Sequence, residues 1–333
     1  MKYRHLGTSG LVVSRLALGT MTWGMDTEES DAELQLRAFR EAGGTLVDTA
    51  DVYVRGESER ILGRLLAKDG GREDLLLATK AYGSTGPGPM GRGTSRGHLL
   101  TALDASLQRL GTDYLDLWQV HAWDPSTPLD ETLDALDAAV RTGRVRYAGI
   151  SNFSGWQLAK AAEHQRAHRQ APIVSAQMEY SLLQRGIERE LVPAALDAGV
   201  GILPWSPLGR GVLTGKYRRG AIPKDSRAAN ENFSQFVEPY LDDDRTHIVD
   251  AVLTAAEGLG VTPAAVALAW VRDRPGVAAP IIGARTAAQL AAALLAEGVT
   301  LPDTIRTALD DVSTPAIGYP ERLPWPGGHD EVE

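Results

Sequence analysis

The chain has 333 residues, 43% of them hydrophobic and 23% charged, and a formal net charge of −9. This composition is typical of a globular protein with a sizeable core, and the negative charge argues against nucleic acid as its main partner. The lack of cysteine excludes disulfides and thiol catalysis, and no apolar run is long enough to span a bilayer. With no recognisable signal peptide, we expect a cytoplasmic protein without a membrane segment.

Strand-like and helix-like segments alternate along the chain. Residues 3–14, with a Thr-Ser-Gly turn, predict a β-hairpin that closes the bottom of the fold. Short apolar runs flanked by polar residues then predict eight buried strands. These lie at residues 16–19, 45–47, 75–79, 115–120, 145–150, 173–177, 201–205 and 277–282.

The segments between the strands carry apolar residues at the spacing of a helix with one buried face. Clear stripes are Ile61, Leu62, Leu65 and Leu66, then Leu100, Leu103, Leu107 and Leu110, then Leu133, Leu136 and Val140. Glycine follows several of these segments, where a helix is expected to end. Eight strand–helix units predict a parallel sheet closed into a (β/α)8 TIM barrel.

We expect one barrel domain over residues 1–333. The barrel and its closing helix would occupy 14–313, with an irregular tail at 314–333. A long connection at 209–244, after the seventh strand, is expected to cover part of the barrel or to carry function. Together with the loops at 82–95 and 122–128, it would shape the pocket.

Four side chains that can move or steer a proton follow three consecutive predicted strands. Asp48 and Tyr53 follow the second strand, Lys80 the third and His121 the fourth. The C-terminal ends of parallel barrel strands share one rim, so these side chains are expected to meet. Each alone has an ordinary alternative role, as a turn cap, solvated lysine, rim aromatic or half-buried histidine. Their shared position favours a common site.

The chemistry of these four groups predicts carbonyl reduction. A nearby ammonium lowers the pKa of a phenol, and a carboxylate holds that ammonium in place. An imidazole can donate a hydrogen bond to a carbonyl, so the set can protonate an oxygen while hydride reaches carbon. No side chain carries a hydride, and a nicotinamide cofactor is therefore implied.

These segments resemble the signatures of the aldo-keto reductase family, in the right order. The resemblance is carried by residues 46–53, 79–80, 119–121, 149–153, 177–182, 205–211 and 282–286. It implies that Tyr53 donates the proton, that Lys80 lowers the pKa of Tyr53 and that Asp48 pairs with Lys80. His121 would orient the substrate carbonyl.

The resemblance also implies a cofactor site. Residues implied to contact the nicotinamide and the pyrophosphate are Ser151, Asn152, Gln177, Trp205, Ser206, Leu208, Gly209, Arg210 and Lys216. Lys216 has a solvated surface lysine as its equal alternative. In the last signature, with Gly283, Arg285 is the expected partner of a 2′-phosphate, which favours NADP(H) over NAD. Gln289 would reach the same place, and Ala293 stands where the family often has Asn.

The substrate is expected to be a small aldehyde or ketone. The resemblance places Met21, Trp23, Tyr82 and Trp123 around it, although plain packing explains aromatic residues at a barrel mouth equally well. No metal site is predicted, because His164 and His168 share a helix face without a carboxylate at ligand spacing. Oligomeric state does not follow from the sequence.

Two other functions fit parts of the pattern. Some proteins that resemble this family are nucleotide-binding potassium-channel subunits, so a sensor with little turnover is one alternative. A lyase or aldolase that forms a Schiff base on Lys80 is the other, because a desolvated amine is nucleophilic. Asp48 argues against it, since a neighbouring carboxylate keeps the lysine protonated.

Overall fold

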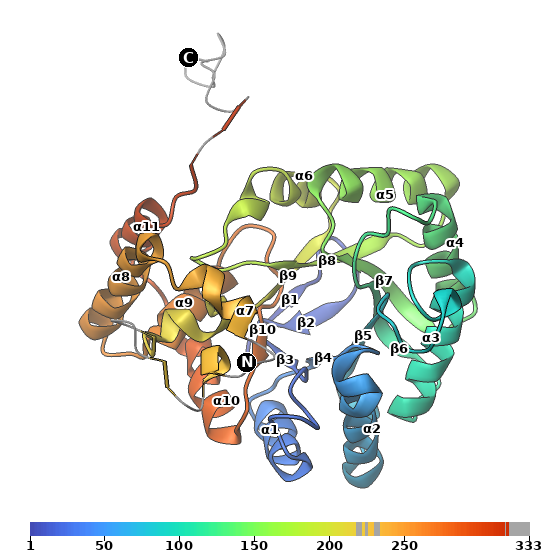
Figure 1. The fold of residues 1–333 in the computed structure, drawn as a ribbon, viewed down its shortest axis with the longest axis horizontal. Helices are drawn as coiled ribbons and strands as arrows, with labels where there is room; N and C mark the ends of the chain where they lie inside the picture. The colour runs from blue at the N-terminus through green and yellow to red at the C-terminus, as the bar shows by residue number, and fades with distance from the viewer. Residues whose placement is uncertain (218–221, 224–225, 230–233, 317, 320–333) are drawn as a thin grey trace.

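The centre of the molecule is an eight-stranded parallel sheet that curls into a nearly closed barrel (Figure 1). The computed structural model describes residues 1–217, 222–223, 226–229, 234–316 and 318–319. The strands, in sheet order from β10 through β3 to β9, confirm the predicted (β/α)8 fold. They are β10 (Ile281–Gly283), β3 (Ala17–Gly19), β4 (Leu46–Asp48), β5 (Leu76–Ala81), β6 (Leu115–Val120), β7 (Val145–Ser151), β8 (Ile173–Glu179) and β9 (Gly201–Trp205).

The barrel closes through a single bridge beside β10. Ile202 of β9 pairs with Val277, and the Ile202 amide and carbonyl bond to Gly276 and Ala278 at 2.8 Å each. The predicted strand at 277–282 is therefore wrong in extent, because only its last two residues belong to β10. Pro280 has no N–H to donate, so it interrupts the ladder before β10 begins.

Helices cover the outside of the barrel (Figure 1). They are α1 (Glu29–Glu41), α2 (Glu57–Asp69), α3 (Arg96–Leu110), α4 (Leu129–Arg141), α5 (Gly155–His168), α6 (Leu191–Asp197), α7 (Ser234–Val237), α8 (Asp243–Leu259), α9 (Pro263–Arg272), α10 (Ala287–Leu294) and α11 (Asp303–Val312). The α2 stripe is buried as predicted, whereas α3 buries Leu99 and leaves Leu100 half-buried. Gly111 and Gly143, at φ 64° and 76°, end α3 and α4 in the left-handed region that suits glycine.

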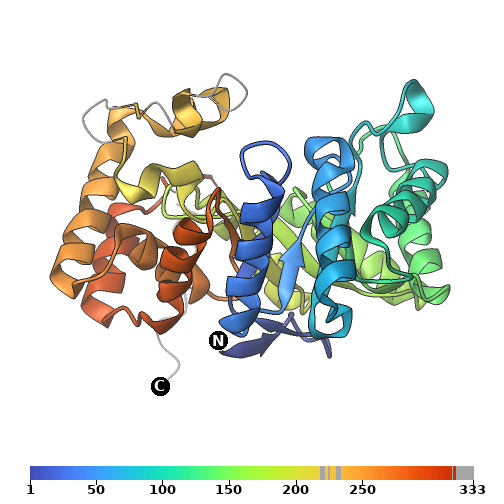
Figure 2. The same cartoon turned by 90° about the horizontal axis from the view of Figure 1, so that it is seen from below.

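The N-terminal hairpin plugs one end of the barrel, as predicted. Strands β1 (Tyr3–His5) and β2 (Val12–Ser14) pair antiparallel and lie beneath the barrel in Figure 2. Leu6, Leu11 and Val13 pack against strand residues that point into the barrel, including Leu117 and Leu203. This end is filled, so a site is left to the opposite rim, where the strands end.

The connection after β9 is partly helical rather than an irregular loop. Its described parts include η5 (Gly209–Thr214), η7 (Arg227–Ala229), α7 and η8 (Glu238–Tyr240). This segment lies on the side opposite the hairpin (Figure 2). Most of the predicted irregular tail, residues 317 and 320–333, lies outside the described part of the chain.

No single helix among the described residues has the length and apolar character to cross a membrane. The adjacent helices Arg245–Leu259 and Pro263–Arg272 meet that test only as a pair, and they are bent by 102°.

Candidate active site

The four predicted catalytic side chains lie together at the C-terminal ends of neighbouring strands. Lys80 Nζ, at the end of β5, donates to Asp48 Oδ2 on β4 and to the Thr49 carbonyl, each at 2.7 Å. It also donates to Tyr53 Oη, in η1 (Tyr53–Gly56), at 3.2 Å. The His121 ring, beyond β6, meets the Tyr53 ring edge-on at a centroid distance of 6.2 Å.

This geometry orients the phenol proton. An ammonium has three N–H donors, and those of Lys80 are taken by Asp48, Thr49 and Tyr53. A carbonyl oxygen only accepts, and the Asp48 carboxylate accepts here as well. Tyr53 Oη therefore accepts from Lys80, and its own hydrogen is left to point elsewhere. Tyr53 lines a cavity, so that hydrogen is available to a bound molecule.

Burial sets the direction of the pKa shift at Asp48, Tyr53 and His121, but not at Lys80. It raises the pKa of Tyr53, although the Lys80 charge acts in the predicted opposite direction. The phenol thus stays protonated at neutral pH, as a general acid must. Burial, with the Lys80 charge, lowers the pKa of His121 to about 3, so its imidazole is neutral. Burial disfavours the Lys80 charge, but Asp48 and Tyr53 outweigh it and raise the pKa of Lys80.

Backbone strain is concentrated around this site. Val54 and Arg55, directly after Tyr53, have φ of 47° and 54°. Asn152, Ser206 and Arg210, which line the cavity, are also left-handed. A left-handed conformation is unfavourable for residues other than glycine, most of all for a β-branched one. Such strain is commonly retained where it places functional groups.

A chain of hydrogen bonds links the predicted carboxamide site to the catalytic carboxylate. Gln177 Nε2 donates to Asp48 Oδ1 at 2.8 Å, and Ser151 Oγ donates to the Gln177 carbonyl at 2.9 Å. Asn152 Nδ2 donates to the His121 carbonyl at 2.9 Å, while Asn152 Oδ1 accepts from Trp205 Nε1 at 3.1 Å. The predicted nicotinamide residues are therefore hydrogen-bonded to the predicted catalytic groups.

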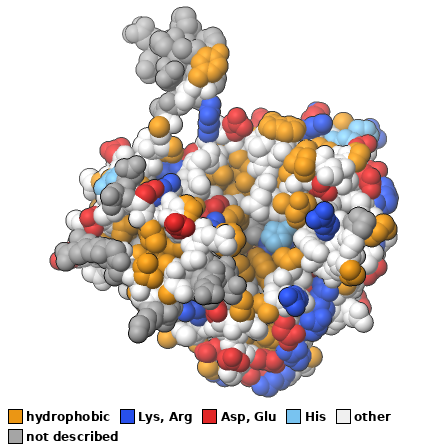
Figure 3. Space-filling model, viewed as in Figure 1, with side chains coloured by type: hydrophobic (Ala, Val, Ile, Leu, Met, Phe, Trp, Pro, Cys, Tyr) orange, Lys and Arg blue, Asp and Glu red, His pale blue; other side chains and the backbone are white. Residues whose placement is uncertain are grey.

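One cavity of about 580 Å³ connects the catalytic groups with the predicted phosphate site. Its volume is in the range of small-molecule and cofactor sites. Figure 3 shows, on the face seen in Figure 1, a hollow with a histidine side chain in it and hydrophobic side chains around it. The lining residues that bear on the predictions are Met21, Asp48, Tyr53, His121, Ser151, Asn152, Gln177, Trp205, Ser206, Leu208, Arg210, Lys216, Gly283, Arg285, Gln289 and Ala293.

The far end of the cavity is built on the start of α10. Thr286 Oγ1 accepts from the Gln289 amide at 3.2 Å, and Gln289 Oε1 accepts from the Arg285 amide at 3.0 Å. The Gln289 side chain thus caps the helix in addition to lining the cavity. Among the described residues, Lys216 has no carboxylate partner, and its Nζ lies 5.1 Å from the centre of the Tyr217 ring.

Arg210 is committed to protein partners. It donates to both oxygens of Glu179, at 3.0 and 3.1 Å, and to the Phe236 carbonyl at 2.8 Å. Tyr240 also donates to Glu179, at 2.9 Å. Although Arg210 lines the cavity, its guanidinium joins the end of β8 to the segment after η5. Arg210 could therefore contact a pyrophosphate only through its backbone or through guanidinium N–H groups that these bonds do not use.

Three predicted pocket residues do not line this cavity. Trp23 is fully buried with its Nε1 bonded to Gln35 Oε1 at 3.1 Å, so the prediction for Trp23 is wrong and it belongs to the core. Trp123 packs on Phe153 and Trp156, at ring distances of 5.3 and 5.4 Å. Tyr82 also lies outside the cavity wall, and only Met21 is part of it.

Gly209 does not line the cavity either, and its Cα faces the Leu183 side chain. Its φ of 53° helps to turn the chain into η5, which is a structural role. Sequence reasoning also missed the apolar wall from α9, made by Ala264 and Leu268, because small apolar residues carry no local signal of a site. Among the described residues, no group of three or more His, Cys, Asp or Glu is arranged to hold a metal ion.

Comparison with known proteins agrees with this barrel and this set of groups. Residues 15–313 match the model of the Aldo/keto reductase family, and the chain belongs to that family. It is 38% identical to the "Uncharacterized oxidoreductase YrpG" of Bacillus subtilis (strain 168), over 98% of this chain and all of that protein. It is therefore an oxidoreductase of this family.

Two other relatives carry different names. The "Probable voltage-gated potassium channel subunit beta" of Arabidopsis thaliana is 37% identical, over 97% of this chain and 98% of that protein. "Protein tas" of Escherichia coli (strain K12) is also 37% identical, over 87% of this chain and 91% of that protein.

Proposed function

We propose that the chain reduces an aldehyde or ketone to an alcohol with hydride from NADPH, and that Tyr53 is the general acid. The observation that carries the proposal is the three-way contact of Lys80 with Asp48, Thr49 and Tyr53. It anchors the phenol oxygen and leaves the phenol hydrogen for a substrate in the cavity. This arrangement suits transfer of a proton to an oxygen that gains negative charge.

The substrate carbonyl oxygen would accept one hydrogen bond from Tyr53 and one from His121. Because the pKa of His121 is lowered to about 3, the neutral imidazole donates without competing as an acid. As the carbonyl carbon is reduced, Tyr53 gives its proton to the new alkoxide. The adjacent Lys80 ammonium then stabilises the phenolate, and solvent restores the proton after the product leaves.

The cavity suits a phosphorylated nicotinamide dinucleotide. NADPH would supply the hydride when bound. Ser151, Asn152 and Gln177 present hydroxyl and amide groups beside Asp48, which suits a carboxamide. Lys216 and Arg285 place two cations in the wall away from Tyr53, which suits phosphate groups and favours NADPH over NADH.

The two alternatives receive less support. Some relatives are named as probable channel subunits, but the chain also matches the family as a whole. Similarity to those relatives therefore does not favour a sensor over an enzyme. The intact catalytic set favours turnover. For a Schiff base, Lys80 would need a free amine, but it is fully buried and bonded to three partners.

The proposal is tested by following NADPH oxidation with a panel of small aldehydes and ketones, together with NADPH binding measured by fluorescence. We expect aldehyde-dependent oxidation that is faster with NADPH than with NADH. Tight NADPH binding without oxidation across the panel would favour the sensor function instead. Borohydride trapping of a carbonyl compound on Lys80 would point to the lyase.

A further inference from the structure

A second group of buried charged side chains lies behind Lys80. Asp51 is 2% exposed, and Glu59, on α2, is fully buried. The Asp51 amide donates to the Lys80 carbonyl at 3.1 Å, which ties Asp51 to the strand that carries Lys80.

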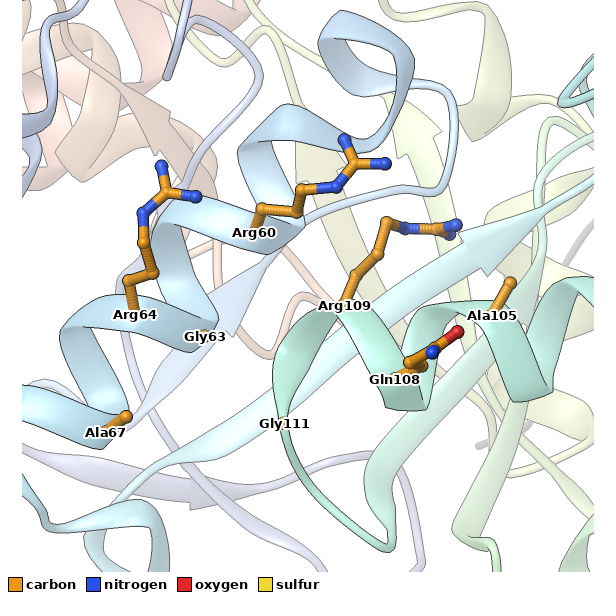
Figure 4. Close-up of a pocket in the computed structure, with 8 residues that line it drawn as sticks. All are labelled: Arg60, Gly63, Arg64, Ala67, Ala105, Gln108, Arg109 and Gly111. Carbon is orange, nitrogen blue, oxygen red and sulfur yellow. The ribbon is translucent and has the colours of Figure 1, made fainter.

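Glu59 has its own cationic partner. Its Oε1 accepts from Thr79 Oγ1 at 2.6 Å, and its Oε2 accepts from Arg109 Nε at 2.6 Å. Arg109 comes from α3 and also donates to Ser106 Oγ at 3.1 Å. Figure 4 shows Arg109 on the wall of a surface groove between α2 and α3, and its side chain is 16% exposed.

Among the described residues, Asp51 is the one carboxyl group of this cluster that is not paired with a cation. Asp48, Asp51 and Glu59 are three buried carboxyl groups, while Lys80 and Arg109 are the cations among them. The Lys80 donors go to Asp48, Thr49 and Tyr53, and Arg109 bonds to Glu59. Within the described part of the chain, neither carboxyl oxygen of Asp51 has a hydrogen-bond partner in good geometry, although the nearby Val52 amide favours the charged form. A buried carboxylate without such a partner is costly, so Asp51 tends to hold a proton.

The surroundings of Asp51 place its ionisation close to neutral pH. Burial and the negative charge of Glu59 raise the pKa of Asp51 to about 7. Arg109, the Val52 amide and Lys80 act in the opposite direction and are outweighed. These groups come from the β4–η1 segment, β5, α2 and α3.

The charge on Asp51 reaches the catalytic phenol. A negative Asp51 acts to raise the pKa of Tyr53, in addition to the effects of burial and Asp48. Lys80, which bonds Tyr53, is attracted to Asp51 as well. A proton gained or lost at Asp51 therefore changes the electrostatic field in which Tyr53 works.

We propose that Asp51 is a positioning residue whose charge sets the acid strength of Tyr53, so that turnover responds to pH near neutrality. Protonated Asp51 leaves Tyr53 the stronger acid, and ionised Asp51 makes Tyr53 the weaker acid. The inference rests on the proposed role of Tyr53 as general acid. His121 does not contribute a transition in this range, because its pKa is lowered to about 3.

The direct test is the pH dependence of kcat for carbonyl reduction at saturating NADPH and substrate. A weaker general acid transfers its proton more slowly, so kcat should fall as the pKa of Tyr53 rises. Wild type is therefore expected to turn over more slowly above neutral pH, where Asp51 is ionised, than below it. Asp51→Asn, which cannot ionise, is expected to lack the transition, whereas Asp51→Glu retains it.

Asp69→Asn, at the exposed end of α2, is the matched control and is expected to follow wild type. The same transition in Asp51→Asn as in wild type would overturn the proposal. If Tyr53→Phe keeps full turnover, the proposed general acid is wrong. If Tyr53→Phe is inactive but Asp51→Asn is unaltered, only the role of Asp51 is wrong.

A second measurement does not depend on activity. In wild-type protein labelled with carbon-13 at aspartate carboxyls, the Asp51 resonance is expected to titrate near neutral pH, well above the ordinary range for aspartate, and burial also raises the pKa of Asp48. That resonance should be missing from Asp51→Asn. A wild-type spectrum in which every aspartate titrates in the ordinary acidic range would contradict the proposal.

Discussion

Gln177 on β8 donates a hydrogen bond of 2.8 Å to Asp48 on β4, although 129 residues separate them in the chain. Asp48 in turn holds Lys80 at 2.7 Å, and Lys80 bonds Tyr53. The side chain proposed to hold the nicotinamide carboxamide therefore also fixes the Asp48 carboxylate that positions Lys80 beside Tyr53, the proposed proton donor. Changes at Gln177 should reach both cofactor binding and stability.

Gln177→Leu is expected to lose stability and NADPH affinity together. Without the amide, the buried Asp48 Oδ1 has lost its donor, which costs about 1–3 kcal/mol. Gln119→Leu is the matched control, because Gln119 is fully buried on β6 and bonds Ser175, but does not line the cavity. Urea unfolding and fluorescence titration should show destabilisation in both variants and weaker NADPH binding only in Gln177→Leu. An unchanged affinity for NADPH in a folded Gln177→Leu variant would show that the Gln177 side chain does not contribute to NADPH binding.

Lys80→Met is expected to be strongly destabilising, because it leaves Asp48 as a buried charge without its cation. Breaking a buried pair in this way costs about 3–5 kcal/mol. Adding Asp48→Asn should restore part of the loss, with a coupling of about 1 kcal/mol or more. A double-mutant cycle by urea unfolding at neutral pH measures this coupling. Losses that simply add would show that the pair is not coupled. Lys68→Met, at an exposed ion pair on α2, should leave stability unchanged.

Arg285→Ala is expected to reduce discrimination between the two nicotinamide dinucleotides. Charged hydrogen bonds to a 2′-phosphate are worth about 1.5–3 kcal/mol, so Kd for NADPH should rise by about tenfold to a hundredfold. Kd for NADH, which lacks this phosphate, should change little. The backbone contacts of Arg285 to Thr27 and Gln289 do not require its side chain. Equal weakening for both nucleotides, or none, would contradict the assignment. Arg306→Ala, on α11, is the control.

Asp51→Asn is expected to become more stable relative to wild type as pH rises. The pKa of Asp51 is raised from 3.8 to about 7, so between these values the folded state binds more protons than the unfolded state. Wild-type stability therefore falls with rising pH over this window, and Asn removes that loss. The difference between the two proteins should grow by an amount on the order of 4 kcal/mol.

His121 acts in the opposite direction over a similar range. Its pKa is lowered from 6.5 to about 3, so the folded state binds fewer protons and gains stability as pH rises through this window. The two effects partly cancel in wild type. The difference between Asp51→Asn and wild type, measured by urea unfolding at several pH values, is therefore the useful quantity. A difference that does not vary with pH would contradict the raised pKa of Asp51.

The meeting of three of the four proposed catalytic side chains was predictable because it depends on strand ends. Once the strands are parallel and adjacent, Asp48, Lys80 and His121 must share a rim, whatever the loops do. The hydrogen-bond partners of individual side chains could not be predicted in the same way. Arg210 has the sequence context of a phosphate contact, but Glu179 and Phe236 take its donors. Trp23 is buried because Gln35, on α1, satisfies its indole N–H.

The buried charges behind Lys80 were also beyond reach of the sequence. Asp51 stands between Asp48 and Tyr53 in the motif, but nothing in the motif shows that its oxygens lack partners. That follows only from the positions of Glu59 and Arg109, which the packing of α2 and α3 determines. The extent of the last strand was predicted wrongly for a local reason. Residues 277–282 have the composition of a strand, but Pro280 interrupts the hydrogen-bond ladder.

Tyr53 is proposed to give its proton to the substrate oxygen. The most direct measurement is single-turnover oxidation of bound NADPH by a reactive aldehyde in wild type and Tyr53→Phe, with the Kd for NADPH measured in both. We predict an unchanged Kd and a rate about 10²- to 10⁴-fold lower in Tyr53→Phe. Equal single-turnover rates in the two proteins would contradict the account.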